Sequence, residues 1–239
     1  MRLLRTLLIA GVVCNALLAC SSAPKVPDWQ LEAKGALERS VMAYLAGDTR
    51  AEAVEFARAK SEVSSTGRID LIARAELLQC ASHVASLVFA PCAGFERLKQ
   101  DAGPAERAYA DYLVGQLQPP DAALLPEPQR AAATGADTAI KSIIDPLSQL
   151  VAAGVAFQSG RASPSVVQMA VDAASSQGWR RPLLAWLGVQ ASLAEKAGDS
   201  ADAARLRRRM ALTQNDKPSQ AAPAGPGVQP VRADTEPQR

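Results

Sequence analysis

The sequence predicts an all-α protein of stacked antiparallel helical hairpins, an α-solenoid-like arrangement of about eight or nine helices. Alanine and leucine are abundant, and aromatic residues make up only 4% of the chain, a composition that favours helices over sheets. Apolar residues recur at helical spacing, and few stretches alternate with the period of a strand. Glycine-containing turns separate the periodic segments, which is typical of short connections between helices.

The first nineteen residues are typical of an export signal. Met1–Arg5 is basic and contains no acidic residue, and Thr6–Ala19 is apolar apart from Asn15. The apolar run has 14 residues, whereas a helix that spans a bilayer needs about 20. A basic start followed by a short apolar run predicts a cleaved signal peptide at 1–19 and no transmembrane anchor.

The four residues Leu17-Leu18-Ala19-Cys20 end this signal, and they resemble the lipobox of bacterial lipoproteins. The resemblance covers only about the first twenty residues of the chain. It implies that Cys20 carries a diacylglycerol thioether and that the new N-terminus is acylated, for example with palmitate, since a thiolate is the nucleophile for such chemistry. Ser21 after the cysteine implies sorting to the outer membrane, facing the periplasm. The alternative is an ordinary secretory signal that is cleaved elsewhere and leaves Cys20 as a free thiol.

Two cysteines remain besides Cys20, because Cys14 lies in the removed segment. An oxidising compartment and an even number of thiols predict a disulfide between Cys80 and Cys92. The alternative is two buried free thiols, since cysteine behaves as a small hydrophobic residue. Two thiols without further histidine or cysteine ligands do not complete a tetrahedral zinc site. We therefore expect no metal and no cofactor.

The N-terminal half predicts a tether at 20–27 and a helical subdomain at 28–118. Asp28 is a suitable N-cap for a helix that runs to about Ala46, and Thr49 with Glu52 resembles a capping box for a second helix. The third predicted helix, at 68–89, has two apolar stripes. A helix that is apolar on two sides is packed between neighbours, so this one is expected to be central.

Four prolines between 119 and 135 predict a linker between two subdomains. Helices resume over 136–213, where Pro146 bends or breaks the first of them and Ser163-Pro164 starts another. The last segment, 214–239, contains five prolines and no leucine, isoleucine or phenylalanine. Such a segment buries too little apolar surface to fold, and it is predicted to be a disordered tail.

Two turns in the predicted helical part have similar sequences, Ala46-Gly47-Asp48-Thr49 and Ala197-Gly198-Asp199-Ser200. This arrangement loosely resembles tetratricopeptide-type helical hairpins, whose repeat is about 34 residues long. Gly198, Asp199 and Ala203 fit the small residues of such a hairpin, but the large aromatic positions are absent. The resemblance implies stacked hairpins and does not extend to a regular repeat array.

Charge and motif content exclude several classes of function. Without Arg2 and Arg5, 24 basic residues balance 24 acidic ones, and a nucleic-acid partner would require a basic excess. His83 is the only histidine, and it falls on a polar strip where we expect a solvated or edge residue and no catalytic one. Nucleophile elbows, zinc-protease motifs and phosphate loops are absent from the sequence. We therefore expect that the protein is not an enzyme.

One local concentration of charge could contact anionic headgroups or an acidic partner; alternatively, it is a solvated helix face. Its residues are Arg205, Arg207, Arg208 and Arg209. Together, the anchor and the stacked hairpins predict a lipid-anchored periplasmic scaffold or interaction protein with an envelope protein as partner. The alternative function is a periplasmic protein that binds a small molecule or a lipid in a cavity between helices.

Overall fold

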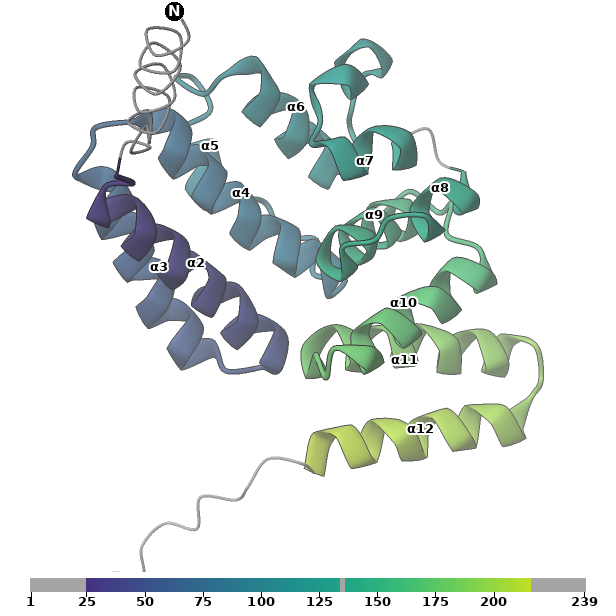
Figure 1. The fold of residues 1–239 in the computed structure, drawn as a ribbon. Coiled ribbons are helices and arrows are strands. Elements are labelled where there is room, and N and C mark those ends of the chain that lie inside the picture. Colours follow the sequence, from purple (N-terminus) through teal and green to yellow (C-terminus); the bar gives the residue numbers. More distant parts are fainter. Residues whose placement is uncertain (1–24, 134–135, 216–239) are drawn as a thin grey trace, which may run out of the picture. The chain divides into compact units, whose positions relative to one another are not determined.

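The structure, a computed structural model, describes residues 25–133 and 136–215. This part of the chain contains eleven α-helices, one 3-10 helix and no strand, which confirms the all-α prediction (Figure 1). Eight of the helices have ten or more residues, in line with the eight or nine expected. The additional ones are short pieces of four to six residues.

Several predictions concern residues outside the described ranges. The signal peptide at 1–19, the lipidated Cys20 and nearly all of the tail at 214–239 lie there, so these remain predictions. Among the helices that are described, none is both long enough and apolar enough to cross a membrane.

The chain divides into two compact units, Met1–Trp186 and Leu187–Arg239. The boundary falls inside α11 (Arg180–Lys196), so the first unit ends with the first two turns of this helix. The second unit contains the remainder of α11 and α12 (Ser200–Asn215).

The first unit begins with three consecutive antiparallel helices, α2 (Asp28–Ala46), α3 (Thr49–Ser64) and α4 (Ile69–Ala85). α2 and α3 pack along their whole length, and the ion pair between Arg39 and Glu55 joins their outer faces at 2.9 Å. Both α2 and α3 contact α4. The stacked antiparallel arrangement predicted from the sequence is therefore present.

The turns at Gly47 and Gly198 share one geometry, as their sequences suggested. Both glycines adopt a left-handed conformation, with φ of 89° and 78°, which is unfavourable for residues with a Cβ atom. In each turn the next aspartate accepts a hydrogen bond at 2.9 Å from the backbone N–H three residues later. Asp48, and not Thr49, is therefore the N-cap of α3, because its carboxylate reaches a free helical N–H.

α4 is central in the first unit, as its two apolar stripes predicted. It contacts α2 and α3 on one side and α6 and α9 on the other (Figure 1). The helix ends at Ala85 and does not reach Phe89 as predicted. Leu87 adopts a left-handed conformation with φ of 59°, and Pro91 lacks the N–H that a continuing helix needs. The chain therefore turns here, which brings Cys92 back to α4.

The remaining helices of the first unit pack around α4 and α9. α9 contacts α4, α6, α7, α8 and α10, and η1 contacts α6 and α7. Their bounds are α5 (Ala93–Glu96), α6 (Pro104–Leu113), η1 (Pro119–Leu124), α7 (Glu127–Ala132), α8 (Asp137–Lys141), α9 (Pro146–Gln158) and α10 (Pro164–Ser176).

The proline-rich segment that we predicted as a linker contains η1 and α7. Pro119 and Pro128 occupy the first turns of these two helices. Backbone N–H groups in the first turn have no acceptor within the helix, so a proline there costs no hydrogen bond. Composition suggested an interruption, but the prolines start short helices. Gln129 ties the segment to its neighbours, because it accepts a hydrogen bond from the Tyr112 hydroxyl at 2.7 Å and donates one to the Ser148 carbonyl at 3.0 Å.

α4 and α9 cross at a point of close backbone approach. A Cβ atom added to Gly154 would lie 2.4 Å from the carbonyl oxygen of Val84, so only glycine fits there. One residue later on α4, the Ala85 carbonyl accepts a hydrogen bond at 3.0 Å from the indole of Trp186, which is fully buried. Pro146 breaks the first of the helices predicted after the linker, so that α8 and α9 are separate helices.

The second unit is a helical hairpin. Glu195 on α11 forms an ion pair with Arg207 on α12, and a side chain at Gly188 would approach Met210. These two pairs run in opposite directions along the two helices, so the hairpin is antiparallel. Ala203 and Leu206 on α12 are buried.

Candidate functional site

The clearest binding feature of the first unit is a groove between α4, α6 and the segment that links η1 to α7. It has a volume of about 450 Å³ and is open to solvent. We call it the α6 groove. The residues that line it are Arg74, Leu77, Leu78, Ala105, Glu106, Tyr109, Leu124, Leu125, Pro126 and Arg130.

Four leucines line the α6 groove, and they differ in exposure. Leu77 and Leu125 are almost fully buried, at 2% and 1% exposure, and form its floor. Leu124 is 41% exposed and forms part of its edge. An apolar floor with an exposed apolar edge can bury a ligand's hydrocarbon surface, which stabilises a complex in proportion to the area removed from water.

Two arginines and one glutamate give the groove its charge. The Nε of Arg74 lies 2.8 Å from a carboxylate oxygen of Glu106, and the two side chains are 62% and 8% exposed. The buried carboxylate is thus neutralised by an arginine that remains largely in water. Arg130 adds a further positive charge, so the formal charge of the lining is positive by one.

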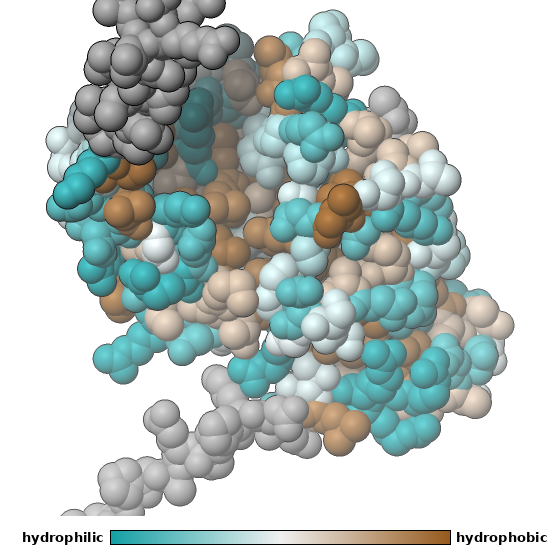
Figure 2. Space-filling view, in the orientation of Figure 1, coloured by the Kyte–Doolittle hydropathy of each residue, from teal (hydrophilic) through white to brown (hydrophobic). Residues whose placement is uncertain are grey.

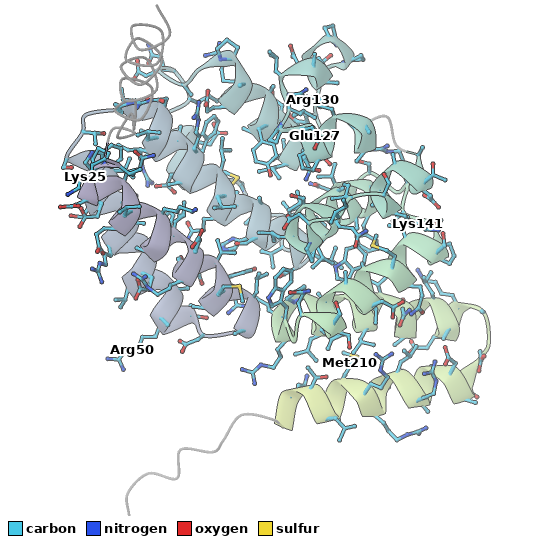
Figure 3. The ribbon with its side chains drawn as sticks, in the orientation of Figure 1. Lys25, Arg50, Glu127, Arg130, Lys141 and Met210 are labelled. Carbon is cyan, nitrogen blue, oxygen red and sulfur yellow. A yellow bond between two sulfur atoms is a disulfide. The ribbon has the colours of Figure 1, made fainter. Side chains whose placement is uncertain are left out.

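Arg130 and Tyr109 bring polar groups that are free to bind. The Nε of Arg130 donates to the Leu125 carbonyl at 2.8 Å, and within residues 25–133 and 136–215 its two terminal nitrogens have no hydrogen bond or ion pair. Burial, and to a smaller extent the charge of Asp145, raises the pKa of the Tyr109 hydroxyl above its usual range. A tyrosine hydroxyl is protonated at physiological pH even without this shift, so the group is a neutral donor. Figure 3 shows Arg130 and Glu127 on α7, near α6.

A second surface lies at α7 and the loop between α8 and α9. A depression of about 430 Å³ there is lined by residues that include Glu127, Ala139 and Ile144. Ile144 is 95% exposed, the largest value among the exposed large hydrophobic side chains of the described chain. Figure 2 shows separate hydrophobic areas on a largely hydrophilic face, one of them over the region of α7 to α9. We call this the Ile144 surface.

The loop that presents Ile144 is held by hydrogen bonds. The side-chain amide of Gln149 donates to the carbonyls of Ile140, Lys141 and Ile143, at 3.4, 3.2 and 3.1 Å. These bonds fix three of the carbonyls around Ile144 to the first turns of α9. The exposure of Ile144 is therefore a property of an ordered loop.

Cys80 and Cys92 form a disulfide, as the sequence predicted, with a Cα–Cα distance of 5.8 Å. Cys80 lies on α4 and Cys92 directly precedes α5. The bond thus holds the chain that leaves α4 against that helix. Stable disulfides form in oxidising compartments such as the periplasm.

His83 lies at the partly exposed edge of a polar cluster between helices. Its side chain is 31% exposed, and its Nε2 lies 3.5 Å from the buried carboxylate of Glu52. Its ring stacks on Tyr44 with centroids 4.3 Å apart, and the guanidinium of Arg181 lies 4.0 Å from the centre of the same Tyr44 ring. The cluster joins α2, α3, α4 and α11, so packing accounts for each of these side chains.

Ion pairs account for half of the arginine cluster on α12. Arg205 pairs with Asp202, and Arg207 pairs with Glu195. Within the described ranges, Arg208 and Arg209 have no side-chain partner, and Arg208 is exposed. A contact with headgroups or with a partner therefore remains a prediction that concerns Arg208 and Arg209 most directly.

Sequence reasoning missed the residues of both surfaces. Tyr109 belongs to no motif that the sequence analysis identified, and Arg130 fell inside the predicted linker. Ile144 stands beside a buried isoleucine and near a proline, and no local signal separates its role from that of its neighbour. Among the described residues, no group of three or more histidine, cysteine or acidic side chains could hold a metal ion.

Comparison with models of known protein families, with curated protein sequences and with solved structures found no match for this chain.

Proposed function

We propose that this protein is a lipid-anchored interaction protein of the bacterial envelope, attached to the outer membrane through Cys20 and facing the periplasm. Its helical domain binds another envelope protein and acts as a scaffold. The proposal assigns it no catalytic role. The proposal requires evidence for a periplasmic location and for a surface that contacts a partner protein.

The Cys80–Cys92 disulfide is the structural observation that supports a location outside the cytosol. A disulfide is rare in proteins that fold in a reducing cytosol and frequent in exported ones. It closes α4 onto the start of α5 and so forms part of the fold. The signal-like N-terminus with its lipobox resemblance is one feature that favours export, and this disulfide is a second one in another part of the chain.

The Ile144 surface supports the contact with a partner. A side chain that is 95% exposed and apolar is unfavourable in water, and its burial in a complex contributes about 1.5–3 kcal/mol. Gln149 holds the loop in place, so little ordering entropy is lost on binding. An exposed apolar side chain on an ordered loop can insert into an apolar pocket of a partner protein.

Metabolic labelling of cells with a palmitate analogue tests the anchor. The change Cys20→Ser is expected to abolish lipid labelling and to release the chain from the membrane fraction. Cys14→Ser is the matched control and is expected to leave both unchanged, because Cys14 lies inside the removed signal. Labelling that persists in Cys20→Ser, or a mature N-terminus at another residue, would show that the anchor is misassigned.

Site-specific crosslinking in intact envelopes tests the contact. A photoreactive residue at Ile144 is expected to give a discrete crosslinked species with another protein. The same residue at Val54, which is 63% exposed on α3, is the control and is expected to give none. If position 144 yields no adduct, or if both positions yield the same adducts, the Ile144 surface is not the partner site.

The alternative function, binding of a small molecule or a lipid, is favoured by one specific observation. The α6 groove combines an apolar floor with the unpaired terminal nitrogens of Arg130. Small-molecule sites commonly show this combination of apolar walls and a few polar groups. An anchored interaction protein could contain such a site as well.

A further inference from the structure

We propose that the α6 groove binds a single-chain amphiphile with a carboxylate head, that is, a fatty acid. The inference goes beyond the anchored interaction protein proposed above and does not depend on the anchor. It rests on the size of the groove, on its apolar floor and on the donors that line it.

The dimensions of the groove suit a small ligand. Its volume of about 450 Å³ lies within the roughly 300–1,000 Å³ of small-molecule sites. The partly exposed Leu78 and Tyr109 and the exposed Leu124 provide the apolar surface that an alkyl chain would cover. Leu124, at 41% exposure, would be covered by the bound chain.

Charge complementarity selects a carboxylate head. The terminal nitrogens of Arg130 have no partner in the described ranges, and the planar guanidinium matches the two oxygens of a carboxylate in a bidentate pair. Glu106 also lines the groove and would repel an anion, but Arg74 neutralises it at 2.8 Å. A cationic amphiphile would find no free carboxylate in this lining.

Tyr109 adds a neutral donor to the same lining. The Tyr109 side chain lines the groove, and its hydroxyl is protonated at physiological pH, as an ordinary tyrosine hydroxyl is. It can therefore contribute apolar area and one hydrogen bond to the ligand. A head with two acceptor oxygens can use Arg130 and Tyr109 together.

Calorimetry with dodecanoate below its micelle concentration tests the proposal. The full chain carrying Cys20→Ser is used, so that an attached lipid cannot compete and the outcome is independent of the anchor. We expect saturable binding of one dodecanoate, at least about tenfold tighter than that of dodecanol, because a charge-assisted bidentate pair is stronger than a neutral hydrogen bond. Dodecyltrimethylammonium is expected to bind no better than dodecanol.

Substitutions locate the site. Arg130→Gln is expected to weaken dodecanoate binding about tenfold and to leave dodecanol binding unchanged, since only the charged head loses a partner. Arg50→Gln, at an exposed arginine on α3, is the matched control with no effect. Tyr109→Phe keeps the ring and the packing and is expected to weaken dodecanoate binding severalfold. This second variant tests the site even if Arg130→Gln does not fold.

Three results would each overturn the proposal. Absence of saturable dodecanoate binding is the first, and equal affinity for dodecanoate and dodecanol is the second. The third is unchanged dodecanoate binding by a folded Arg130→Gln or Tyr109→Phe chain. The crosslinking and labelling experiments on Ile144 and Cys20 are not affected by any of these results.

Discussion

Gly154 offers a sharp test of how α4 and α9 pack. A Cβ atom added there would lie 2.4 Å from the Val84 carbonyl oxygen and 2.9 Å from a Val84 methyl carbon. Non-bonded atoms are optimal at about 3.5 Å or more, so Gly154→Ala would push the helices apart by about 1 Å. The obstacle is backbone, and it cannot rotate away as the end of a side chain can.

The expected cost follows from two opposing effects. Overpacking in a well-packed core destabilises by about 1–3 kcal/mol and sometimes more. Alanine in place of glycine inside a helix recovers up to about 1 kcal/mol of helix propensity. The free energy of unfolding of Gly154→Ala is therefore expected to fall by about 1–2 kcal/mol, and its melting temperature to fall by roughly 2–8 °C.

Thermal and urea unfolding followed by circular dichroism measure this loss, and the fluorescence of buried Trp186 reports on the same region. Gly188→Ala on α11 is the matched control. There the nearest atom to an added Cβ is a methyl carbon of Met210 at 3.9 Å, so this change is expected to stabilise slightly. If Gly154→Ala melts at or above the unmodified chain while the control behaves as expected, α4 and α9 do not approach as described.

Three other predictions concern stability. Tyr112→Phe removes the hydroxyl that donates to the buried Gln129 side-chain oxygen at 2.7 Å. The free energy of unfolding in urea should fall by about 1–3 kcal/mol, and an unchanged unfolding midpoint would contradict this. Replacing Cys80 and Cys92 together by alanine removes a disulfide between residues that are 12 apart in sequence, and should lower the free energy of unfolding by about 3 kcal/mol. Reduction of the unmodified chain should lower it by the same amount. Burial raises the pKa of Tyr109 and Tyr112, so their stabilisation is complete below the unfolded value of about 10 and is lost as the pH rises through the higher folded values. Absorbance titration should show these two tyrosines ionising last, and normal titration of all tyrosines would refute it.

Local sequence signals predicted much of the fold. Ser163-Pro164 predicted the start of α10, and the structure has that helix at Pro164–Ser176 with Ser163 as its N-cap. The two similar turns at Gly47 and Gly198 predicted hairpins of the same geometry. The apolar stripes on two sides of α4 predicted its central position. Each of these signals acts within about one or two helical turns, a range over which sequence spacing directly sets geometry.

The proline-rich segment 119–135 shows where local signals fail. Composition alone favours a linker there, but contacts of η1 with α6 and of α7 with α9 make short helices stable. Gln129 is almost fully buried and binds groups 17 and 19 residues away in the chain. Short helices are marginal by themselves, so their stability comes from tertiary packing.

The α6 groove and the Ile144 surface also depend on tertiary packing and not on local sequence signals. Arg74 and Glu106 are 32 residues apart in sequence, yet they form one ion pair in the α6 groove. Of two adjacent isoleucines at 143 and 144, one is 9% exposed and the other 95%. Helical periodicity shows which residues share a face, but it does not show which faces meet. That choice depends on how the side chains of distant helices fit together, and the sequence of one helix does not contain this information.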